Sequence, residues 1–149
     1  MTISRTARIE LPLLAVGQSH KELFHNEALA RLDFVLHPHV QAIESDPSSL
    51  VPENGQSWLV GADATDAWAG REDQIAGWTG NGWLFIAPLA LMRVFVESID
   101  SFATYRGAWQ LNDAVTSPSG GSVIDTESRF AIDSLLAALQ EQGILKPGL

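Results

Sequence analysis

All five tryptophans of this 149-residue chain lie between Trp58 and Trp109, and the first three are spaced ten residues apart. The same window holds nine of the twelve aromatic side chains. Large aromatic residues recur at such intervals when short strands alternate with tight turns around one core. The spacing is also compatible with an exposed aromatic platform that binds a ligand. The window therefore predicts a small β-rich domain and leaves open which tryptophans face solvent.

Six short segments of the chain have the composition of strands, and they are residues 56–61, 74–79, 82–87, 91–97, 101–105 and 108–111. Thr79-Gly80-Asn81-Gly82 lies between two apolar runs and predicts a type I′ hairpin turn. Two registers are possible, with Trp78 opposite either Phe85 or Trp83. Both registers place Trp78, Trp83 and Phe85 on one face, because strand side chains alternate with period two. An antiparallel meander is the simplest arrangement of these strands.

Helical periodicity flanks the aromatic window on both sides. The first predicted helix runs from about Ser19 to Leu36, and Ser19 with Glu22 forms a capping-box pattern. The second begins after Asp125, which can cap it, and runs to about Gln142. We therefore expect an α+β fold with an N-terminal helix, a central Trp-rich antiparallel β-meander or small barrel or sandwich, and a C-terminal helix after a flexible linker.

The C-terminal helix carries an apolar stripe that needs a partner. Its members recur at i, i+3, i+4 and i+7, with Phe130 nearby, and they are Ile132, Leu135, Leu136 and Leu139. Gly143 and Ile144 then match the C′ and C″ positions of a Schellman end. The stripe can pack on the chain's own β domain, or it can drive self-association, since an isolated helix of this length is marginal in water. These five apolar residues are the candidate oligomer interface.

Composition divides the chain into three regions. Residues 1–49 form an N-terminal segment whose helix could serve attachment, residues 50–115 form the aromatic-rich β domain, and residues 116–149 form a linker and the amphipathic helix. Serine, proline and glycine dominate residues 116–122, which predicts the flexible linker.

Charge and composition argue against several classes of partner. The net charge is −9, and residues 40–79 contain seven acidic side chains and one basic one. Such a surface repels phosphate backbones and anionic lipids, so we expect neither nucleic acid nor membrane as a partner. The chain has no cysteine, no recognisable signal peptide and no apolar stretch of membrane-spanning length. We expect synthesis in the cytoplasm.

Enzyme chemistry has little support in the sequence. Neither a nucleophile elbow nor a phosphate-binding glycine motif is present. His37-Pro38-His39 could chelate a metal, and the acidic loop at residues 61–74 could hold calcium, but isolated histidines and solvated acidic loops are commoner. We expect no catalytic residues, no metal site and no cofactor.

The tryptophans remain the main candidates for ligand binding. Core packing is the commoner role for Trp58, Trp78 and Trp83, whereas the settings of Trp68 and Trp109 suggest loops or turns. Tryptophan faces stack on sugar rings and anchor interfaces. Trp68, Trp109, Trp78 and Trp83 are therefore the candidate ligand-binding residues, and of these Trp68 and Trp109 have the better claim to solvent exposure.

Three groups of segments resemble a known family. The first and most specific is Leu11–Gln18 with His25–Asp33; the second is Ser57–Gly61, Ala67–Gly70 and Gly82–Pro88; the third, shared by several short phage structural proteins, is Gly120-Gly121 and the pattern from Asp125 to Leu139. The chain resembles uncharacterised proteins found in alphaproteobacterial prophages and gene transfer agents, among tail, fibre or head-spike genes. One departure is Leu89–Met92, which lacks the glycine expected before a strand of this type.

The resemblance implies a structural component of a virion or gene-transfer-agent particle. In that setting the protein would be a homo-oligomeric adaptor or base of a head spike or tail fibre, with capsid, tail or fibre proteins as partners. The alternative is a carbohydrate-binding module that recognises a host surface polysaccharide. The family supplies no catalytic or binding residues to carry over to this chain.

Overall fold

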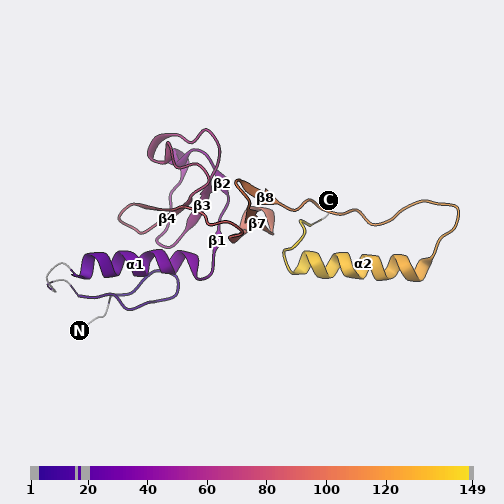
Figure 1. Cartoon of the computed structure of the whole chain (residues 1–149), viewed down its shortest axis with the longest axis horizontal. Helices are drawn as coiled ribbons and strands as arrows, with labels where there is room; N and C mark the ends of the chain where they lie inside the picture. The colour runs from indigo at the N-terminus through magenta and orange to yellow at the C-terminus, as the bar shows by residue number, and fades with distance from the viewer. Residues whose placement is uncertain (1–3, 16, 18–20, 148–149) are drawn as a thin grey trace. The chain divides into compact units, whose positions relative to one another are not determined.

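The computed structural model describes residues 4–15, 17 and 21–147. The described residues form two α-helices and eight short strands in two sheets, which confirms the α+β class (Figure 1). The chain divides into two compact units, Met1–Leu89 and Ala90–Leu149. The boundary between them lies inside the predicted β domain of residues 50–115. Neither α-helix is long and apolar enough to cross a membrane, as far as the described residues show.

One sheet of four strands organises the first unit. Its strands pair in the order β2-β3-β4-β5 and span Ile43–Glu44, Ser57–Val60, Ile75–Trp78 and Trp83–Ile86. β3 is buried along its whole length, as expected of a central strand covered on both faces. β2 runs parallel to β3, so the sheet is not a pure meander. The sequence did not indicate β2, the short β1 (His39–Val40) or the 3-10 turn η1 (Pro47–Ser49).

The hairpin between β4 and β5 adopts one of the two predicted registers. Trp78 pairs with Trp83, and the Thr79 N–H donates to the Gly82 carbonyl oxygen at 3.1 Å. Gly80 has φ +77°, whereas Asn81 does not have a positive φ. The turn therefore has the pattern of type II′, in which only the first central residue is left-handed, and the type I′ prediction was wrong.

Helix α1 (Lys21–Val35) covers the face of this sheet that carries Gly77. The Phe34 ring lies directly over Gly77. Any side chain at position 77 would occupy the space that the ring fills. α1 begins at Lys21, and Ser19, the predicted capping residue, lies outside the described residues. Gly17 N–H nevertheless donates to Glu22 at 3.4 Å.

Two polar side chains of α1, Asn26 and Asp33, bind the N-terminal segment through hydrogen bonds. Asp33 accepts hydrogen bonds from the Thr6 hydroxyl and from the backbone N–H groups of Arg8 and Ile9 at 2.7–2.9 Å. Asn26 binds both the N–H and the carbonyl of Leu14, at 2.9 and 3.0 Å. These contacts satisfy backbone groups that no strand pairs, because a buried unpaired amide would be costly.

The second unit begins with an antiparallel meander. β6 (Arg93–Val96) pairs with β7 (Ser101–Tyr105), which pairs with β8 (Trp109–Leu111), and the 3-10 turn η3 (Glu97–Ile99) joins the first two. Val94 and Val96 are fully buried, whereas Arg93 is exposed, as the alternating pattern predicts. Just before β6, Leu91 has φ +65°, a conformation that favours glycine. The turn before β6 therefore has the backbone conformation for which glycine was expected, and Leu91 adopts it with local strain.

Helix α2 (Thr126–Glu141) is capped at both ends as predicted. The Asp125 carboxylate accepts from the Ser128 N–H at 2.9 Å, and this bond lowers the pKa of Asp125. At the other end the Ile144 N–H donates to Leu139 and the Gly143 N–H donates to Gln140, which is the Schellman pattern.

The residues after α2 return to the meander of the same unit. The Gly143 carbonyl accepts from the Phe102 N–H at 2.8 Å and from the Ser101 hydroxyl at 3.1 Å. The Asn112 side chain donates to the Ile144 carbonyl at 2.7 Å. Residues 143–146 therefore form a C-terminal hook that secures the end of α2 beside the start of the linker.

We predict that Gly77→Ala lowers the free energy of unfolding by roughly 1–3 kcal/mol, because the new Cβ would overpack the Phe34 ring. The ideal Cβ position is 2.6 Å from the ring carbon Cζ of Phe34. Urea denaturation measures the loss. In a Phe34→Leu background the same substitution should cost less, since the ring is gone; an equal cost in both backgrounds would contradict this packing.

Candidate functional site

Four tryptophans form one cluster on the face of the first sheet opposite α1. Trp83 lies at its centre, with ring centroids 5.7 Å from Trp58, 5.0 Å from Trp68 and 4.9 Å from Trp78. All three pairs are edge-to-face, with interplanar angles between 66° and 81°. This geometry is favourable because the positive edge of one ring meets the negative face of the other. Three strands and one loop are joined through this single side chain.

Trp68 reaches the cluster through the 3-10 turn η2 (Asp66–Trp68), which folds over the sheet. The Thr65 N–H donates to the Ser45 carbonyl at 2.9 Å, and the Arg71 N–H donates to the Trp68 carbonyl at 2.9 Å. Trp68 is 0% exposed. The expectation that it is among the most exposed tryptophans was therefore wrong: the loop composition was recognised, but the loop turns its tryptophan inward.

The other candidate tryptophans keep part of their surface. Trp78 and Trp83 are half-buried at the hairpin end of the cluster. Trp109, in the second unit, is also half-buried and packs edge-to-face on Tyr105 at 5.3 Å. The four predicted ligand-binding tryptophans thus do not form one platform, because Trp68 is enclosed and Trp109 belongs to a different sheet.

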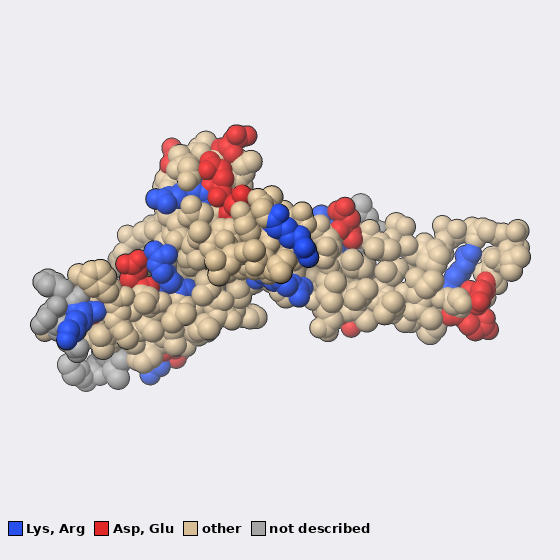
Figure 2. Space-filling model, in the orientation of Figure 1, with Lys and Arg blue, Asp and Glu red and all other residues tan. Residues whose placement is uncertain are grey.

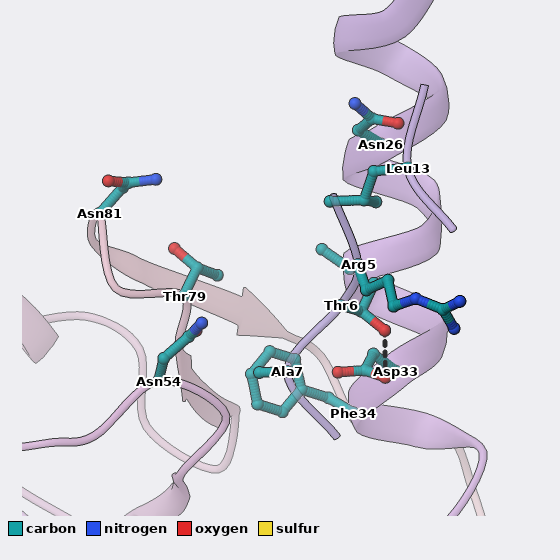
Figure 3. A pocket seen from close by; sticks show the side chains of 11 residues that line it. Arg5, Thr6, Ala7, Leu13, Asn26, Asp33, Phe34, Asn54, Thr79 and Asn81 are labelled. Carbon is teal, nitrogen blue, oxygen red and sulfur yellow. Dashed lines mark hydrogen bonds between the residues drawn. The ribbon is translucent and has the colours of Figure 1, made fainter. Parts of the chain in front are cut away.

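A separate pocket of about 180 Å³ lies in the first unit, between the N-terminal segment, α1 and the β4–β5 hairpin (Figure 3). The side formed by α1 and the N-terminal segment mixes the apolar residues Leu13, Ala30 and Phe34 with polar ones such as Asn26 and Asp33. The facing wall carries the side chains of Asn54, Thr79 and Asn81, which Figure 3 shows on the hairpin side. An apolar surface facing a few fixed polar groups is typical of ligand sites.

Some polar side chains of this pocket already have hydrogen-bond partners in the chain, and others do not. Asp33 and Asn26 are committed to the N-terminal segment, and the Thr79 hydroxyl donates to Gly82 at 2.9 Å. Asn54 and Asn81 have exposed carboxamides with no partner among the described residues. The sequence marked both positions only as turn residues, so nothing in it indicated that the two turns converge.

The arginines near the pocket interact with backbone carbonyls, an aromatic ring or a carboxylate. Arg8 donates to the carbonyls of Phe34 at 3.2 Å and His37 at 2.9 Å, and its guanidinium lies over the Phe34 ring at 5.7 Å. Burial lowers the pKa of Arg8, and the nearby Asp33 carboxylate offsets part of this effect. Arg5 is paired with Glu10 at 3.6 Å. The two charged residues among the described lining of the pocket, Arg5 and Asp33, thus both have partners.

Acidic and basic side chains are interspersed on the face shown in Figure 2, and the basic ones are isolated there. Among the described residues no three His, Asp or Glu side chains come together to hold a metal ion. The acidic loop at residues 61–74 instead positions Trp68, and several of its aspartates occupy left-handed turn positions: Asp63, Asp66 and Asp73.

A family profile matches residues 25–110, a range that starts in α1 and ends in β8. The chain belongs to the DUF2793 family. That family is described as a protein of unknown function. The DUF2793 match includes all five tryptophans, and α2 lies outside the matched range. No curated protein and no solved structure matches the chain.

We predict that Trp83→Ala lowers the free energy of unfolding by about 3 kcal/mol, since it removes the ring that three others contact. Near-ultraviolet circular dichroism should lose the signal of the coupled indoles. Trp78→Ala is the matched control, because Trp78 contacts the cluster through Trp83; it should cost less. Equal losses for the two variants would contradict the central position of Trp83.

Proposed function

We propose that this protein is a homo-oligomeric structural component of a phage-like particle, serving as the adaptor or base of a head spike or tail fibre. The observation that supports the proposal most is the apolar stripe of α2. No residue of α2 is buried, and Ile132 and Leu135 are 44% and 62% exposed. Leu136 and Leu139 are half-buried. Helices with an uncovered stripe of this kind gain stability by packing on a copy of themselves.

The position of each apolar residue on α2 defines the proposed interface. At about 100° per residue, Ile132, Leu135, Leu136 and Leu139 fall within a single narrow face. Phe130 lies two residues before Ile132 and therefore about 200° away from it around the helix. We accordingly narrow the predicted interface to the four aliphatic residues. Phe130 is 74% exposed and forms a separate apolar position on the opposite side.

The two capped ends suit α2 to such a role. Asp125 and Gly143 fix where the helix starts and stops, and the C-terminal hook ties it to the meander. A helix held in this way loses less conformational freedom on association than a free one, which favours binding. The partners in the particle would be capsid, tail or fibre proteins, and the place of action is the released particle.

We predict that Leu135→Asp dissociates the oligomer, with an association constant lowered at least tenfold, because each interface would bury an unpaired carboxylate. Size-exclusion chromatography with light scattering should then give the 16.1 kDa monomer at micromolar concentration. Phe130→Asp is the matched control: it makes the same chemical change on the other side of α2 and should leave the oligomer intact.

Two results would contradict the proposal. One is a wild-type protein that is monomeric at every concentration tested. The other is an oligomer that Leu135→Asp leaves unchanged. Immunogold labelling of purified particles tests the location separately, and absence of the protein from released particles would overturn the structural role.

Carbohydrate binding is the second candidate function, and the half-buried Tyr105–Trp109 pair favours it. The two rings lie directly opposite each other on β7 and β8, beside the tight turn at Gly107. An aromatic pair that keeps part of its surface can stack on a sugar ring. Trp78 and Trp83 offer a second, similar edge in the first unit.

We expect polysaccharide from a host surface to change the tryptophan fluorescence if this second function operates. Trp109→Ala should then abolish the change, whereas Trp68→Phe should retain it, since Trp68 is enclosed. A titration without any spectral change, or one that Trp109→Ala leaves intact, would count against a site at this pair.

A further inference from the structure

The pocket of the first unit is lined by two carboxamides, those of Asn54 and Asn81, that make no hydrogen bond to other described residues. Asn54 and Asn81 come from different turns, and the Asn54 side chain lies against the hairpin turn, 3.5 Å from where a Gly80 Cβ would be. Each carboxamide offers one acceptor and two donors. Leu13, Ala30 and Phe34 also line the pocket and form its apolar wall, which offers surface for one side chain.

This combination matches an extended peptide better than an isolated small molecule. A carboxamide can pair with the N–H and the carbonyl of one residue, and Asn26 does this with Leu14 in the same unit. An anchor side chain in a small apolar pocket, with backbone hydrogen bonds beside it, is a recurring mode of peptide recognition. The cavity of about 180 Å³ has room for one aliphatic side chain rather than a folded element.

The linker before α2 has the features expected of a peptide that could occupy this pocket. Val123 and Ile124 are 87% and 60% exposed, and no backbone N–H of residues 113–124 donates a hydrogen bond within the described chain. Residues 119–122 are small and polar, so they would not obstruct entry. The linker therefore has no helix or strand of its own, and it exposes an aliphatic pair and backbone N–H groups that no described residue pairs.

We propose that the pocket bounded by Asn54, Asn81 and Phe34 binds residues 122–124 of a second copy of this chain. Val123 or Ile124 inserts against the apolar wall, and the two carboxamides pair with the linker backbone. The contact joins two different surfaces, so it is heterologous and can link copies in series. It rests on the homo-oligomer of the proposed function for its setting, but it uses neither α2 nor the tryptophans.

Nuclear magnetic resonance tests the contact with a synthetic peptide of residues 119–126, acetylated and amidated. The receptor is the full chain with Val123→Ser and Ile124→Ser, which removes competition from its own linker at positions that are exposed. We expect saturable shifts of the side-chain NH₂ signals of Asn54 and Asn81, with millimolar affinity because one inserted side chain gives weak binding. A peptide with serine at both aliphatic positions should produce no saturable shift.

Variants of the pocket make the assignment specific. Asn54→Ala combined with Asn81→Ala should weaken binding about tenfold or more, followed through the backbone signals of Thr79 and Ala30. Gln110→Ala is the matched control, since it deletes an exposed carboxamide elsewhere and should change nothing. Absence of saturable shifts, or equal binding of the serine peptide, overturns the proposal.

Two further arms separate this proposal from its alternatives. Saturable shifts with methyl α-glucoside and none with the peptide would assign the pocket to sugars and overturn the peptide site. Repeating the peptide titration with Leu135→Asp in the receptor distinguishes the two oligomer contacts. Peptide binding that persists in this monomeric background supports the pocket contact independently of α2, whereas an α2-dependent oligomer without peptide binding retains the proposed function and overturns this inference.

Discussion

The edge-to-face packing of Trp83 is the interaction on which the first unit depends. It connects β3, β4, β5 and the loop that carries Trp68, so residues separated by up to 25 positions in the chain share one contact point. Because an aromatic pair contributes beyond its buried area only in favourable geometry, the cluster fixes relative strand positions as well as stability. On the opposite face of the sheet, α1 packs closely because Gly77 leaves space for the Phe34 ring.

The sequence predicted the parts of the fold that depend on local pattern. Both helices, the six longer strands and the ends of α2 follow from periodicity and capping residues. Trp68 shows why the rest did not follow: the residues around it have loop composition, and burial was decided by how the loop closes through the Thr65–Ser45 hydrogen bond. The pocket was unpredictable for the same reason, since Asn54 and Asn81 are brought together only by tertiary structure. The turn type at Gly80 was also missed, because glycine at this position suits more than one turn.

The range matched by the family profile and helix α2 are separate parts of the chain. The DUF2793 match ends at residue 110, within β8, the last strand of the described chain. The Trp cluster lies within the matched range, whereas the linker and α2 lie beyond it. The pocket combines both parts, since Arg5 and Leu13 precede the matched range and Asn54 and Asn81 lie within it.

The C-terminal hook has a consequence for how the linker and α2 can change. Asn112 and Ile144 are joined by a hydrogen bond, and Asp113 and Lys146 approach to 3.6 Å. The linker and α2 thus form one segment, an excursion from the meander, whose two ends lie side by side at residues 112–113 and 144–146. Such an excursion can be shortened, lengthened or exchanged for another without moving the strands on which it stands. The site is consequently a natural place for grafting a foreign segment, or for divergence between related chains.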